Sequence, residues 1–66
     1  MQIRNFTEIE LEYFRKWCNF TDDEMLYFNL KAKNYSNVQV SLEMHVSESQ
    51  VSKLARKVKS KILRVI

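Results

Sequence analysis

Apolar and polar positions follow one local pattern that recurs four times along the chain. An apolar residue precedes a Ser or Thr, and a Glu or Gln with a second apolar residue follows three positions later. In such a segment the Ser or Thr hydroxyl accepts a hydrogen bond from the backbone N–H of the third helical residue. The Glu or Gln side chain at that third position accepts one from the backbone N–H of the Ser or Thr, and the two apolar residues pack together and set the angle at which the chain enters the helix. The copies predict four helices, at residues 8–18, 22–33, 37–44 and 48–65, with ends uncertain by about two residues.

The segments between these helices are short and polar. Asn19 and Asn34 follow the first two helices, and Asn tolerates the left-handed conformation that ends a helix. The chain holds no glycine and no proline, so Ser, Thr, Asn and Asp supply its turn signals. Short connections leave no room for a linker or a second domain. The sequence therefore predicts one small all-α, four-helix domain over residues 1–66.

The last predicted helix has an apolar face and a basic face. At about 100° per residue, its apolar residues form one stripe about 100° wide, as expected for a helix that packs on a core. The stripe consists of Val51, Leu54, Ala55, Val58 and Ile62. With positions from the preceding helices it predicts a core of Leu26, Leu30, Val40, Met44, Val46, Val51, Leu54 and Val58.

Only three residues, 45–47, separate the third helix from the fourth, and two helices joined by so short a turn form a helix-turn-helix. The stretch 36–54 resembles the helix-turn-helix of LuxR-type (GerE-like) regulators and of sigma-70 region 4. Val40-Ser41 matches the apolar-small pair of those families, Met44-His45-Val46-Ser47 matches their turn, and Val51 with Leu54 matches the core positions of the second helix.

The resemblance covers about residues 20–63, because Phe20-Thr21-Asp22-Asp23-Glu24 looks like the opening of the families' preceding helix. The helix-turn-helix proper spans about 36–58. His45 stands where the families usually have Gly, and Ser41 where they usually have Ala. We expect positive φ at His45, since His is among the residues enriched there, and close helix approach at Ser41.

The net charge of +3 is concentrated at one end of the chain. Residues 1–35 carry six acids and five bases, whereas residues 36–66 carry two acids and six bases, all after residue 52. A face that is merely solvated usually mixes signs, and a row of like charges repels itself. The distribution favours a polyanion partner, and the resemblance implies that this partner is double-stranded DNA.

The resemblance also implies which residues contact DNA. In a helix-turn-helix the start of the second helix enters the major groove, and Lys, Arg, Glu and Ser all have partners on base edges. Glu48 has a second interpretation, since an acid in the first turn favours the helix dipole. Gln50 could read adenine unless its side chain caps the backbone. The predicted DNA-binding residues are Glu48, Ser49, Ser52, Lys53, Arg56 and Lys57.

A further set is expected to contact phosphates. Lys61 and Arg64, like Lys57, lie further along the last helix than the N-terminal part that enters the groove. Ser36 and Asn37 stand at a helix N-terminus, where free amides attract anions.

The composition argues against an enzyme and against a metal or cofactor site. His45 and Cys18 are the single residues of their types, so no His or Cys ligand set exists. The absence of glycine excludes phosphate-cradling loops. Cys18 is expected to be a small buried hydrophobe. The longest apolar run, residues 25–28, is far too short to span a membrane.

These features predict a transcriptional regulator that binds specific DNA sequences. The unpaired thiol and the lack of a signal sequence indicate a reducing, cytoplasmic setting, and the short chain beginning with Met1 suggests a complete protein of a phage or another mobile element. The alternative is a protein-interaction module with a sigma-region-4-like fold that binds RNA polymerase or another regulator. Apolar positions in the first helix exceed one stripe, so a homodimer through this aromatic N-terminal helix is a further possibility.

Overall fold

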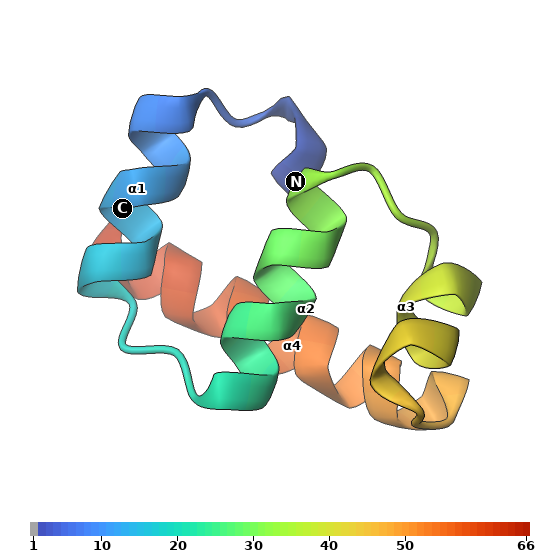
Figure 1. Ribbon diagram of the computed structural model, residues 1–66. Coiled ribbons are helices and arrows are strands. Elements are labelled where there is room, and N and C mark those ends of the chain that lie inside the picture. Colours follow the sequence, from blue (N-terminus) through green and yellow to red (C-terminus); the bar gives the residue numbers. More distant parts are fainter. Residues whose placement is uncertain (1) are drawn as a thin grey trace.

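Each α-helix begins directly after a capping hydroxyl, as the sequence predicts. The computed structural model describes residues 2–66, and Figure 1 shows its helices. A short 3-10 segment, η1, precedes four α-helices and was not predicted. The α-helices begin at the predicted residues and end within one residue of the prediction, and residues 2–66 contain no strand. The elements are η1 (Ile3–Asn5), α1 (Glu8–Trp17), α2 (Asp22–Ala32), α3 (Asn37–Met44) and α4 (Glu48–Val65).

Within residues 2–66, three residues adopt positive φ, and each stands just after a helix. Asn19 has φ 54°, Asn34 has φ 70° and His45 has φ 57°. The prediction for His45 is confirmed. Its N–H points back to the carbonyls of Leu42 and Ser41, as at a left-handed helix end. The left-handed residue turns the chain sharply enough for α4 to begin three residues after α3.

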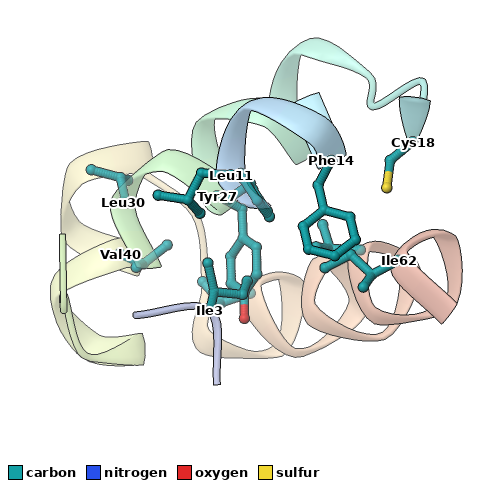
Figure 2. Close-up of a cluster of buried hydrophobic side chains, with 11 residues drawn as sticks. Ile3, Leu11, Phe14, Cys18, Tyr27, Leu30, Val40 and Ile62 are labelled. Atoms are coloured by element: carbon teal, nitrogen blue, oxygen red, sulfur yellow. The ribbon is translucent and has the colours of Figure 1, made fainter. Parts of the chain in front are cut away.

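The long helix α4 is the element on which the others pack. In Figure 1 it runs from α3 across α2 to α1. Its buried side chains are Val51, Val58 and Ile62, all without solvent exposure, while Leu54 and Ala55 are partly buried. The apolar stripe predicted for this helix is therefore confirmed, and Figure 2 shows Ile62 within the core cluster.

The predicted core is confirmed in part. Leu30, Val40, Val51 and Val58 are buried. The three residues Met44, Val46 and Leu54 are only partly buried and pack against the core from outside. The prediction for Leu26 is wrong, since its side chain is 44% exposed. Glu24, Tyr27 and Phe28 take the inner face of α2, and Leu26 lies about 160° from Phe28 around the helix.

The N-terminal segment completes the core with residues from outside the resemblance. Ile3 of η1 is buried, and α1 contributes Leu11, Phe14 and the free Cys18. The prediction that Cys18 is buried is confirmed, and burial raises the pKa of its thiol. Figure 2 shows Phe14 and Cys18 on the side of α1 that faces Ile62.

Candidate nucleic-acid interface

The outer face of α4 presents the six residues predicted to bind DNA through the second helix of the helix-turn-helix. Because Val51, Val58 and Ile62 are turned into the core, the opposite face of the helix is left open. The six predicted residues come from one helix and share its outer side over three turns. All six are exposed: Glu48, Ser49, Ser52, Lys53, Arg56 and Lys57.

The positive charge on this face is not neutralised by nearby carboxylates. The ion pairs in residues 2–66 join Arg15 to Glu12 and Lys61 to Glu24, so Lys53, Arg56 and Lys57 belong to neither. Glu48 supplies the only acid of α4 and stands in its first turn. Uncompensated cations in a row attract a polyanion and repel one another.

The cap at the start of α4 differs from the other three. At Thr7, Thr21 and Ser36 the capping box is closed, with hydrogen bonds in both directions. At Ser47 the hydroxyl accepts from the Gln50 N–H at 3.2 Å, but within residues 2–66 the Gln50 side chain returns no hydrogen bond. The fourth box predicted from the sequence is therefore half formed.

An open cap changes the interpretation of Gln50. Its carboxamide is exposed at the beginning of α4 and is not occupied by the backbone of Ser47. A carboxamide in this state can donate to and accept from one adenine edge. The sequence pattern assigned the Gln50 side chain to the cap. The structure shows that this side chain does not bond the Ser47 backbone, so its carboxamide is free for another partner.

Lys61 differs from the other bases of α4. Its ammonium donates to a carboxylate oxygen of Glu24 and, at 3.1 Å, to the carbonyl of Asn19. The Glu24 side chain is only 4% exposed. Lys61 is therefore not one of the free cations on the outer face of α4. Arg64, the other base expected to contact phosphates near this end, is exposed.

This ion pair also sets the pKa of Glu24. Burial opposes ionisation of the carboxyl, but the hydrogen bonds from Lys61 and from the Thr21 N–H outweigh it, so the pKa lies below its usual value. Glu24 is thus ionised near neutral pH and holds Lys61 in place.

At the start of α3, the two predicted phosphate contacts already have partners within the protein. The Ser36 hydroxyl accepts from the Gln39 N–H at 3.2 Å, and the Asn37 side-chain oxygen accepts from the Lys31 ammonium at 3.2 Å. The first backbone amides of the helix still lack intrahelical partners. Lys31 adds a base at this point that sequence reasoning did not assign, since it lies six residues away on another helix.

The turn between α3 and α4 is tightly packed. Ser41 is buried and its hydroxyl donates to the Val38 carbonyl at 2.7 Å, while the Val46 N–H reaches the Ser41 carbonyl at 3.1 Å. A small side chain at Ser41 fits where α3 meets α4. The position of α4 relative to α3 is thereby fixed by local contacts.

The described residues offer neither a metal site nor a membrane-spanning helix. Within residues 2–66, no three His, Cys, Asp or Glu side chains lie together as metal ligands, and no helix there has both the length and the apolar character to cross a membrane. No protein-family model, curated protein or solved structure matches the chain.

Proposed function

We propose that the protein binds double-stranded DNA through the outer face of α4 and regulates transcription. The observation that carries the proposal is the row of exposed bases Lys53, Arg56 and Lys57, which belong to neither ion pair, on a helix whose opposite face packs on the core. In this proposal α3, its turn and α4 act as the helix-turn-helix that the sequence resembles, in sigma-70 region 4 and in LuxR-type domains.

The residues divide into two groups according to their place along α4. Those in its first three turns reach base edges: Lys53 and Arg56 donate to guanine, and Gln50 reads adenine. Glu48, Ser49 and Ser52 complete this set. Lys57 and Arg64 contact phosphates, as do Ser36 and Asn37 through the start of α3. The base contacts specify the sequence, and the phosphate contacts position the helix.

A salt series on the wild-type chain tests this proposal. A pool of random duplexes is selected for binding, and the affinity of the selected duplex is measured at increasing salt. If Lys57 and Arg64 each neutralise one phosphate, the logarithm of affinity falls with the logarithm of salt with a slope of about −1.8.

A matched control is Lys33→Gln, which removes an exposed base from α2's end rather than from α4. It should leave affinity nearly unchanged, whereas Lys53→Gln should weaken it. Absence of binding to any duplex at low salt would rule the proposal out.

A second candidate function rests on a different surface. Ile9, Tyr13 and Trp17 are spaced four residues apart on the outer side of α1, and Ile9 is 82% exposed and Trp17 58% exposed. The Tyr13 hydroxyl donates to the Val65 carbonyl at 3.3 Å, so the end of α4 adjoins this α1 stripe. Exposed apolar residues in such a row are typical of a protein contact.

For this stripe a protein-interaction role means binding RNA polymerase, another regulator or a second copy of the chain. The second copy is the occupant that can be tested with the protein alone, by light scattering over a range of concentrations. Apolar association should persist at high salt, while binding of DNA should not. A monomer at every concentration would leave only a different protein as the partner of the stripe.

A further inference from the structure

A cavity of about 440 Å³ lies where η1, α2, the start of α3 and α4 meet. Its volume falls within the range typical of small-ligand sites, about 300–1,000 Å³. Its apolar wall comes from Ile3, Ala55 and Val58, and polar side chains surround the rest. The cavity shares Asn37 with the proposed phosphate contacts at the start of α3, but none of the proposed base-reading residues of α4 lines it.

Three bases and no acid line this cavity. They come from three different elements: Arg4 from η1, Lys31 from α2 and Lys59 from α4. A guanidinium nitrogen of Arg4 donates to the Asn34 side-chain oxygen at 2.8 Å, and Lys31 donates to that of Asn37 at 3.2 Å. Because these partners are neutral amides, they orient the cations without cancelling their charge.

The floor of the cavity carries a polar group that the protein leaves unused. Tyr27 is only 5% exposed, and Figure 2 shows its hydroxyl pointing past Ile3 toward α4. Within residues 2–66 no buried side-chain oxygen lacks a partner, so the Tyr27 hydroxyl, which makes no hydrogen bond to these residues, is open to the cavity that Tyr27 lines. Burial raises the pKa of Tyr27, so at neutral pH the phenol keeps its proton and can donate it in a hydrogen bond.

We propose that this cavity binds a small phosphate monoester of about mononucleotide size. Three cations that line one cavity match a phosphate, which carries a charge of about −1.5 to −2 at pH 7, better than a single carboxylate. The Tyr27 hydroxyl donates to the same ligand, and the accessible apolar surface of Ile3 and Ala55 contacts its apolar or aromatic part. A phosphate held on a bulky duplex backbone is expected to reach the exposed side chains of Arg4 and Lys59 and not Tyr27, which is only 5% exposed.

The test is a calorimetric titration of the full chain with adenosine monophosphate, cytidine monophosphate, inorganic phosphate and adenosine. The monophosphates should bind more tightly than inorganic phosphate, because they also contact the apolar wall, and adenosine should bind weakly or not at all. Amide chemical shifts should move at Tyr27, Ala55 and Val58.

Variants separate a built site from general attraction to a basic protein. The double change Lys31→Gln with Lys59→Gln should weaken monophosphate binding at least tenfold, and Tyr27→Phe several-fold, while circular dichroism reports that each variant folds. The control, Lys16→Gln with Lys33→Gln, removes the same charge outside the cavity and should bind as the wild type does.

Three results would overturn the proposal: no monophosphate binding at low salt, equal losses in the cavity and control variants, or displacement of the monophosphate by a short duplex with the same shifts at Tyr27. The last would identify the cavity as a contact for a DNA phosphate. None of these measurements depends on sequence-specific DNA binding, so failure of the cavity proposal and failure of the proposed function are distinguishable.

Discussion

Glu24 and Lys61 stand 37 residues apart in the chain and form an ion pair between α2 and α4. The same oxygen of Glu24 that accepts from Lys61 also accepts from the Thr21 N–H, at 3.0 Å, in the cap of α2. The Glu24 carboxylate therefore serves both in the cap of α2 and in a tertiary contact with α4. The Lys61 ammonium adds a bond to the Asn19 carbonyl in the loop before α2, so one side chain joins the loop, α2 and α4.

Replacing Glu24 with Gln should lower stability and weaken its dependence on pH. A Gln side chain can still accept from the Thr21 N–H, so the change chiefly removes the charge that pairs with Lys61. We expect a loss of about 1.5–3 kcal/mol at pH 7, the range for a hydrogen bond to a charged group, measured by urea unfolding.

The pH dependence follows from the lowered pKa of Glu24. Its contribution is complete above the pKa of an unfolded glutamate, about 4.3, and is lost as pH falls through the lower pKa of the folded state. The wild type should therefore lose stability below about pH 4.3 more steeply than Glu24→Gln. Parallel curves for the two proteins would show that the ion pair contributes nothing.

Lys61→Ala should lower the stability of the protein, whereas Lys57→Ala should leave it nearly unchanged. Lys57 is exposed and unpaired, while Lys61 holds a buried carboxylate. Removing one partner of a largely buried pair leaves the other uncompensated. Thermal unfolding should show a clear drop in Tm for Lys61→Ala and almost none for Lys57→Ala; equal Tm values would mean that Glu24 finds another partner.

His45→Gly should leave the protein unchanged in stability or stabilise it by up to about 1 kcal/mol. At φ 57° the His45 Cβ is crowded by the backbone, and Gly lacks that atom. His45→Ala keeps the Cβ and serves as the comparison, so it should be less stable than His45→Gly. A marked loss on His45→Gly, by chemical denaturation, would reveal a stabilising role of the imidazole.

Lys53→Ala and Arg56→Ala should each weaken binding to the selected duplex by about 1–3 kcal/mol, because each loses contacts to base edges. Neither side chain packs on the core, so Tm should stay nearly constant. Arg64→Ala should instead weaken all duplexes alike and reduce the salt slope by about 1. Fluorescence anisotropy on selected and random duplexes distinguishes these effects. Equal, sequence-independent losses at all three positions would reduce the face to an electrostatic patch.

The double change Ile9→Ser with Trp17→Ser should abolish self-association through the α1 stripe. Both side chains are mostly exposed, so Tm should change little. Leu42→Ser is the control, since Leu42 is an exposed leucine on α3, away from the stripe. Sedimentation velocity should show monomers for the double variant and unaltered association for Leu42→Ser. Equal effects of both changes would contradict a specific interface.

Local features of the fold follow from the sequence because their causes lie within a few residues. The hydroxyls of Thr7, Thr21, Ser36 and Ser47 mark the first turn of each α-helix, since a cap needs only an oxygen within reach of an amide three residues on. Positive φ at His45 was also predictable, because His is among the residues enriched in that conformation and the turn that requires it lies within a few residues. The apolar stripe of α4 specified which side of that helix carries its bases.

Features that depend on neighbouring elements were decided only by the tertiary structure. Leu26 is exposed because Tyr27 and Phe28 fill the space against α4. The local sequence alone does not tell which of these three adjacent apolar residues is buried. Lys61 appeared equivalent to Lys57 until α2 placed Glu24 beside it. The pairing of a base with an acid, like the gathering of three bases around one cavity, depends on distances between helices, which the periodicity of a single helix does not contain.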